Sequence, residues 1–213
     1  MTKVFFWIGH DEAPEISGAS LRPYFDAEFL EGILSVRNAP LRAMKLRAAA
    51  LLAHGVETLG VADFPLAIER TAHGKPFVRR GSFEYSITHT NRFAAVAFSS
   101  HPVGIDAERV TRRIDARRIA EHFFTVDEVK ELARAEWNAE LFFTIWTTKE
   151  AFFKREGSGI DDRLRDMNYR SMQTADGAVT HRYAVEDIRI TVLSGDAESA
   201  FIDATDAVSR LLQ

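Results

Sequence analysis

The chain has 213 residues, which is enough for one large domain or two small ones with a substantial hydrophobic core. Hydrophobic residues make up 46% and charged residues 27%, and the formal net charge is −4, so the chain is typical of a globular protein without an overall positive field for nucleic acid. It contains no cysteine, which excludes disulfides, thiolate metal sites and cysteine nucleophiles.

The first apolar run, residues 4–8, predicts a buried strand and is too short for the hydrophobic region of a signal peptide. No uninterrupted apolar run approaches the roughly 20 residues that a membrane-spanning helix needs. We therefore expect a cytoplasmic protein with no membrane partner. Residues 26–55 are rich in Leu, Ala, Arg and Glu, which predicts two helices that meet at residues 38–40 (NAP).

The middle of the chain is rich in strand-forming residues. The pattern predicts a turn leading into a strand, a pair of strands and one further short strand, at residues 74–78, 83–88 with 93–98, and 103–108. A second helical block is expected over residues 115–155, with a break at 123–125. A second strand-rich block is expected over residues 167–204.

Helices followed by strands thus occur twice along the chain. This order predicts an α+β fold of two similar halves, residues 1–102 and residues 103–213, although no sequence motif is repeated between them. No low-complexity linker separates the halves, which favours close packing between them. Ligand sites are common at such seams, so we expect the active site there.

Two carboxylates are expected on one face of the strand at residues 103–108. The two-residue period of a strand sends Asp106 and Glu108 to the face opposite its apolar residues. Gly104 lies on the carboxylate face, where a missing side chain would leave room for a ligand to approach the backbone. The alternative is an edge strand with a solvated acidic face, and a D-x-E pattern alone does not decide between them.

A third carboxylate lies in residues 141–154, which have the apolar spacing of a helix packed against a core. Glu150 and Lys154 form an i, i+4 pair, and the alternative interpretation is an exposed salt bridge worth about 0.3–0.5 kcal/mol. If Glu150 instead meets Asp106 and Glu108, a cation must relieve the repulsion between three carboxylates. Oxygen ligands favour Mg²⁺, which commonly binds together with a diphosphate.

Groups suited to phosphate oxygens occur earlier in the chain. Lys75 lies in a Gly-Lys-Pro turn, and residues 86–91 (SITHTN) supply three hydroxyl groups and the imidazole of His89. An ordinary proline turn and a polar hairpin loop are the alternatives for these two segments.

Five motifs follow one another in the chain: GKP at 74–76, SITHT at 86–90, VGIDAE at 103–108, FFT at 123–125 and WTTKEAFFK at 146–154. In this order they resemble the motifs of the 4′-phosphopantetheinyl transferase superfamily, specifically its larger, monomeric Sfp-like type. The resemblance is close over residues 74–160. Many relatives have Ser-His-Ser where this chain has Thr-His-Thr at 88–90, and a bulkier aliphatic residue in place of Ala107.

The resemblance implies a pseudo-twofold relation between the halves, with coenzyme A bound between them. It implies a site of three metal ligands, Asp106, Glu108 and Glu150, and four groups on the phosphates of coenzyme A, Lys75, Thr88, His89 and Lys154. For the adenosine 3′-phosphate it implies an arginine of the N-terminal helices, for which Arg47 is favoured over Arg42.

The implied reaction is magnesium-dependent transfer of 4′-phosphopantetheine from coenzyme A to a serine of an apo acyl or peptidyl carrier protein. The catalytic residues would be Glu150, Lys154 and His89, with Glu150 taking the serine proton directly or through a metal-bound water. Five arginines following the metal strand could attract an acidic carrier: Arg109, Arg112, Arg113, Arg117 and Arg118. The alternatives are a magnesium-dependent phosphohydrolase and a non-catalytic module that binds coenzyme A or a carrier.

Overall fold

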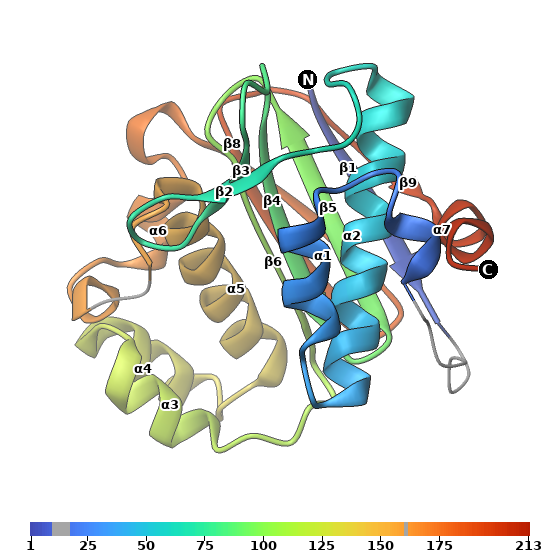
Figure 1. Ribbon diagram of the computed structural model, residues 1–213. Helices are drawn as coiled ribbons and strands as arrows, with labels where there is room; N and C mark the ends of the chain where they lie inside the picture. Colours follow the sequence, from blue (N-terminus) through green and yellow to red (C-terminus); the bar gives the residue numbers. More distant parts are fainter. Residues whose placement is uncertain (10–17, 160–161) are drawn as a thin grey trace.

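The computed structural model describes residues 1–9, 18–159 and 162–213. The helices are α1 (Ala27–Leu34), α2 (Ala39–Leu59), α3 (Ala116–Phe123), α4 (Val126–Arg134), α5 (Ala139–Glu156), α6 (Tyr169–Met172) and α7 (Thr205–Leu211). The strands are β1 (Thr2–Ile8), β2 (Ile68–Arg70), β3 (Pro76–Val78), β4 (Glu84–Thr90), β5 (Phe93–Ser99), β6 (Gly104–Arg109), β7 (Val179–Val185), β8 (Ile188–Ser194) and β9 (Ser199–Asp203). This mixture of helices and sheets confirms the predicted α+β class (Figure 1).

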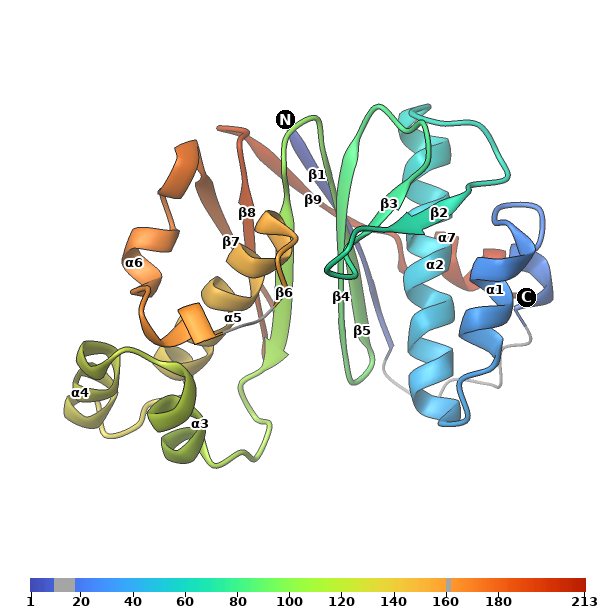
Figure 2. The same ribbon diagram turned by 60° about the vertical axis from the view of Figure 1, so that its left-hand side comes forward.

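Two sheets form the centre of the molecule. The first has the strand order β4-β5-β1-β9, in which β9 pairs parallel with β1, and the second has the order β6-β8-β7 and is antiparallel. Helix α2 lies beside the first sheet and α5 beside the second (Figure 2). A separate β2–β3 hairpin lies between the end of α5 and the top of α2 (Figure 2).

The apolar faces explain this layering. Val4, Phe6 and Ile8 of β1 share one buried cluster with residues of β6 and β8, whereas Phe5 and Trp7 join the cluster that contains α2. Because successive side chains of a strand point to opposite faces, β1 is buried on both sides. The apolar run at residues 4–8 therefore holds both layers together, as expected of a buried strand.

Helix ends match polar residues in the sequence. The predicted break at 123–125 separates α3 from α4, and Thr125 begins α4 with a capping box completed by Glu128. The second strand-rich block was predicted too long, because residues 169–172 form α6 and strands begin only at Val179. Short apolar stretches do not distinguish a helical turn from a strand by periodicity.

A buried ion pair joins the helices around α5. Lys149 Nζ lies 3.0 Å from Glu128 Oε2, and neither side chain is exposed to solvent. The same ammonium group donates to the carbonyls of Leu164 and Met167, both at 2.6 Å. These bonds satisfy the buried charge and fix α4 and the 164–167 segment against α5.

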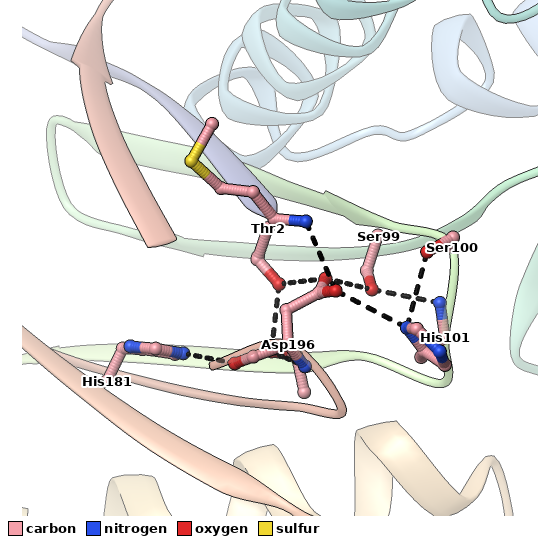
Figure 3. A network of polar contacts seen from close by, with 8 residues as sticks. Thr2, Ser99, Ser100, His101, His181 and Asp196 are labelled. Atoms are coloured by element: carbon pink, nitrogen blue, oxygen red, sulfur yellow. Dashed lines mark hydrogen bonds and ion pairs between the residues drawn. The ribbon is translucent and has the colours of Figure 1, made fainter. Parts of the chain in front are cut away.

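A second polar network ties the two sheets together at their edge (Figure 3). Asp196 Oδ2 accepts hydrogen bonds from the hydroxyl groups of Thr2 and Ser99, both at 2.8 Å. His101 Nδ1 lies 3.4 Å from Oδ1, and His181 Nε2 lies 3.0 Å from the Asp196 carbonyl oxygen. One side chain from the β8–β9 connection therefore links β1 and β5 of the first sheet to the loop that enters β6.

None of the helices in the described parts of the chain combines the length and hydropathy needed to cross a lipid bilayer.

Candidate functional site

Asp106 lies in the middle of β6 with 6% of its surface exposed. Its Oδ1 atom accepts hydrogen bonds from Lys154 Nζ at 2.6 Å and from the Thr88 hydroxyl group at 3.2 Å. Its Oδ2 atom has no hydrogen-bond partner among the described residues. A buried carboxylate oxygen without a partner is costly, so this atom is suited to accept an additional ligand.

Glu108 follows on the same face of β6, as the strand period predicted. Arg112 Nη1 donates to both of its carboxylate oxygens at 3.0 Å. Burial and the charge of Asp106 raise the pKa of Glu108, while Arg112 and Lys154 oppose the increase. The carboxylates of β6 therefore affect each other electrostatically.

Glu150 reaches the same neighbourhood from α5. Burial, followed by the charge of Asp106 and, more weakly, that of Glu108, raises the pKa of Glu150 to about 7, against the opposing charge of Lys154. The ion pair that Lys154 forms is with Asp106, so the exposed Glu150–Lys154 pair considered from the sequence is not the arrangement found. Helix α5 and strand β6 thus bring the three predicted carboxylates into one electrostatic neighbourhood.

No set of three His, Asp or Glu side chains in the described ranges is already drawn together as metal ligands. The residues nevertheless fit a hard divalent cation in two respects. Asp106 Oδ2 is buried and unpartnered, and mutual repulsion contributes to the raised pKa values of Glu108 and Glu150. All three groups offer carboxylate oxygens, the ligand type that Mg²⁺ prefers.

A cavity of about 310 Å³ adjoins these groups, and Lys75, Glu150 and Lys154 are among its lining residues. It lies where the tip of the β2–β3 hairpin comes next to the C-terminal end of α5 (Figure 2). Lys75 Nζ donates to the carbonyl of Arg155 at 3.1 Å and to that of Val103 at 3.4 Å. The hairpin lysine therefore lies beside the end of the helix that supplies Glu150.

The polar residues of β4 contact β6. The Ser86 hydroxyl accepts a hydrogen bond from Ile105 N at 3.2 Å, and the Thr88 hydroxyl accepts one from Ala107 N at 3.1 Å. These contacts join strands of the two different sheets through side chains. Thr88 is buried and orients Asp106, and its predicted contact with a phosphate group stays a prediction.

His89 is exposed, one residue beyond Thr88. Desolvation, Lys154 and Lys45 lower its pKa, in that order of importance. Lys45 lies on α2 and was missed from the sequence, although it falls between the two candidate arginines of that helix. The tertiary fold places its charge near His89, which sequence spacing alone does not reveal.

The two candidate arginines differ in their surroundings. Arg47 is 4% exposed, and its guanidinium carbon lies 4.4 Å from the centre of the Trp7 ring. Burial lowers the pKa of Arg47. Arg42 instead donates to the Val36 carbonyl at 2.8 Å and so closes the turn between α1 and α2.

Gly104 has a different role from the one expected. A Cβ atom at this position would lie 1.9 Å from the Ala151 carbonyl oxygen and 2.5 Å from the Arg155 backbone nitrogen. The missing side chain therefore admits the backbone of α5 rather than a ligand. This close approach still serves the site, because it brings Glu150 and Lys154 next to the carboxylate face of β6.

The fold and the site define a mixed α+β protein in which carboxylates and cationic groups from two sheets, a helix and a hairpin gather beside a cavity. Comparison with known protein families matches residues 102–204 to the 4′-phosphopantetheinyl transferase superfamily. The chain is 38% identical over 120 residues to "4′-phosphopantetheinyl transferase psf-1" of Bacillus pumilus, covering 55% of this chain and 50% of that protein. It is 33% identical over 111 residues to "4′-phosphopantetheinyl transferase Sfp" of Bacillus subtilis (strain 168), covering 51% and 48%.

A third relative, "4′-phosphopantetheinyl transferase gsp" of Aneurinibacillus migulanus, is 35% identical over 107 residues, covering 49% of this chain and 44% of that protein. The matched region thus spans about half the length of these curated relatives. Over residues 102–204 the chain is similar to the 4′-phosphopantetheinyl transferase superfamily, and the relatives it resembles include Sfp.

Proposed function

We propose that this protein transfers the 4′-phosphopantetheine group of coenzyme A to a serine of an apo acyl or peptidyl carrier protein and releases adenosine 3′,5′-bisphosphate. The supporting observation is the shared neighbourhood of Asp106, Glu108 and Glu150, with Lys154 bonded to Asp106 and a cavity alongside. The names of the relatives support the same reaction.

In this proposal Asp106, Glu108 and Glu150 hold Mg²⁺. The unpartnered Asp106 Oδ2 and the repulsion among the carboxylates are the support for this assignment. When bound, the metal would supply positive charge to the diphosphate of coenzyme A.

Cationic and neutral polar groups of the chain bind and orient that diphosphate. Lys154 and Lys75 line the cavity, and His89 with the hydroxyl of Thr88 completes the set predicted from the sequence. Arg47 is the proposed partner of the 3′-phosphate. Charge-assisted bonds from these groups stabilise the negative charge that develops on the departing phosphate.

Proton transfer is assigned to Glu150. The serine oxygen attacks the phosphorus atom attached to pantetheine, and the bond from that atom to the bridging oxygen of the diphosphate breaks. The serine proton passes to the Glu150 carboxylate, and adenosine 3′,5′-bisphosphate leaves with the bridging oxygen. Burial and the neighbouring carboxylates raise the pKa of Glu150 in the metal-free protein, and a bound cation would lower it again and favour the ionised carboxylate that can accept a proton.

The carrier is proposed to dock near the start of the second helical block. Arg109 pairs with Asp187 and Arg112 with Glu108, so these two arginines have partners within the chain. Arg113 and Arg118 are exposed and offer positive charge to an acidic carrier. We also propose that the protein is a cytoplasmic monomer and that its activity needs neither a nucleic acid nor a membrane.

Mass spectrometry tests the proposed reaction. The protein is incubated with coenzyme A, Mg²⁺ and a panel of apo carriers, and one carrier should gain about 340 Da at its serine. Phosphate release without a carrier would instead identify a phosphohydrolase. Binding of coenzyme A without modification of any carrier would identify a binding module.

A further inference from the structure

Tyr85 is a buried polar residue that the proposed chemistry leaves without a role. It lies on β4 with 2% of its surface exposed, and it belongs to the lining of the same cavity as Lys75, Glu150 and Lys154. Its hydroxyl group is buried and has no hydrogen-bond partner in the part of the chain that the structure describes. Most buried polar groups in folded proteins are paired, so an unpaired one needs an explanation.

The unpaired hydroxyl is a cost to the ligand-free protein. Leaving a buried donor and acceptor unsatisfied costs stability, and a phenylalanine at this position would avoid that cost. Burial raises the pKa of Tyr85, so the group stays protonated and keeps its donor. A ligand entering the cavity would supply the missing partner.

The surroundings indicate which part of a ligand would meet this hydroxyl. Apolar side chains of Pro76, Ile87 and Phe153 line the same cavity. Tyr85 lies three strand residues before Thr88, about 10 Å along an extended chain, and strand alternation points its side chain to the other face of β4. Because Lys154 and Tyr85 both line the cavity, a ligand with its diphosphate near Lys154 would present a neutral portion to Tyr85.

A charged residue of the β2–β3 hairpin that acts on Tyr85, Arg70, has another partner. Arg70 acts electrostatically on Tyr85, and its Nη1 atom donates to the Gly74 carbonyl at 2.9 Å. Arg70 thus holds the hairpin tip that borders the cavity. The Tyr85 hydroxyl therefore stays without a partner among the described residues, in a side chain that lines the cavity.

We propose that the Tyr85 hydroxyl is a binding group for the neutral, heteroatom-bearing portion of coenzyme A, supplied either by the amides of the pantetheine arm or by the adenine ring. This inference rests on the proposed function. It adds a residue that selects the ligand by a hydrogen bond to an uncharged atom, beyond the cations that bind phosphate.

The test compares wild type with Tyr85→Phe, using Tyr183→Phe on β7 as a matched control. Thermal unfolding without ligand is measured first, because removal of an unpaired hydroxyl should leave Tyr85→Phe at least as stable as wild type. Calorimetry with Mg²⁺ then measures binding of coenzyme A, adenosine 3′,5′-bisphosphate and 4′-phosphopantetheine. We expect Tyr85→Phe to bind coenzyme A about tenfold more weakly and Tyr183→Phe to match wild type.

The fragments identify the source of the hydrogen bond. Weaker binding of 4′-phosphopantetheine alone would assign it to the arm, and weaker binding of adenosine 3′,5′-bisphosphate alone would assign it to the adenine. Unchanged coenzyme A binding by Tyr85→Phe, or a lower melting temperature of its ligand-free form, would overturn this inference and leave the proposed function intact. Failure of wild type to bind coenzyme A would overturn both.

Discussion

Single residues of α5 have distinct electrostatic surroundings. Glu150 and Lys154 lie one helical turn apart, yet Lys154 bonds to Asp106 whereas the raised pKa of Glu150 reflects burial and the carboxylates of β6. The lysine therefore pairs with a carboxylate of β6, whereas burial and the negative charges of β6 favour the protonated form of the glutamate in the metal-free protein.

Glu150→Gln should abolish transfer to the carrier while coenzyme A remains bound. The amide keeps the shape of the side chain but cannot accept the serine proton, so we expect at least a ~100-fold loss in kcat. Transfer is followed by mass spectrometry and coenzyme A binding by calorimetry. Glu140→Gln, at the exposed start of the same helix, is the control, and near-normal turnover by Glu150→Gln would refute its assignment as the base.

For single residues, the sequence predicts the face on which a side chain lies better than it predicts which distant residues that side chain contacts. The strand period correctly placed Asp106 and Glu108 on one face, since alternation is a local property. Other features depend on tertiary packing: the contact of Arg112 with Glu108, the charge of Lys45 near His89 and the unpaired hydroxyl of Tyr85. No local pattern distinguishes Tyr85 from any other aromatic residue of a buried strand.

Two features that each depend on one residue hold neighbouring helices and strands close together. Gly104 lets the backbone of α5 approach β6, and the Asp196 network joins the two sheets at their edge (Figure 3). Each feature can be removed by one substitution. For Asp196 the resulting loss of stability should depend on pH.

Gly104→Ala should destabilise the fold by at least about 2 kcal/mol, because the new methyl group would overlap backbone atoms of α5 that cannot rotate away. Gly32→Ala is the matched control. At Gly32 in α1 an added methyl group would meet no described atom within 4 Å outside its own stretch of helix, so this change should stabilise the helix by roughly 0.5–1 kcal/mol. Urea denaturation measures both, and equal effects would contradict the proposed packing role of Gly104.

Stability that depends on Asp196 should be lost in acid. Burial alone would raise the pKa of Asp196, but hydrogen bonds from Ser99, Thr2 and the N-terminal ammonium group outweigh it and lower the pKa to about 2. A lowered pKa stabilises the fold above the unfolded value near 4, by about 2 kcal/mol, and this contribution disappears as the pH falls towards 2.

Urea denaturation of wild type and Asp196→Asn between about pH 3 and pH 7 tests this dependence. The difference in unfolding free energy should be largest above about pH 5 and should shrink as the solution becomes more acidic. Asp63→Asn, at an exposed carboxylate, is the control and should show a small difference throughout. A difference for Asp196→Asn that grows towards low pH would contradict the predicted sign.

Across the whole molecule, the basic residues of α3 lie far from the C-terminal helix α7 (Figures 1 and 2). This separation makes α7 a suitable position for a control charge reversal. Arg112 is unsuitable for such a test, because its substitution would also release Glu108.

Charge reversal at Arg113 and Arg118 together should raise KM for the carrier several-fold and leave KM for coenzyme A unchanged, since exposed charges mainly steer association. The effect should weaken as salt increases. Arg210→Glu on α7 is the control, measured in the same steady-state assay. Equal changes in both KM values would remove the docking assignment.

The general arrangement was largely predictable from the sequence. Long periodic segments indicated α2 and α5, and turn residues marked the strand pair β4 and β5. The order of strands within the sheets was not predictable, because pairing between distant segments leaves no local pattern. The division at residue 102 and the pseudo-twofold relation remain predictions.

The pairing of β9 with β1 has a consequence for how the protein is made. Strand β1 is synthesised well before its partner β9, because residues 199–203 lie alongside residues 2–6. Until β9 is made, the outer edge of β1 offers unpaired backbone groups to any other extended chain. We therefore expect nascent or prematurely terminated polypeptides of this protein to need chaperone protection that the finished molecule does not.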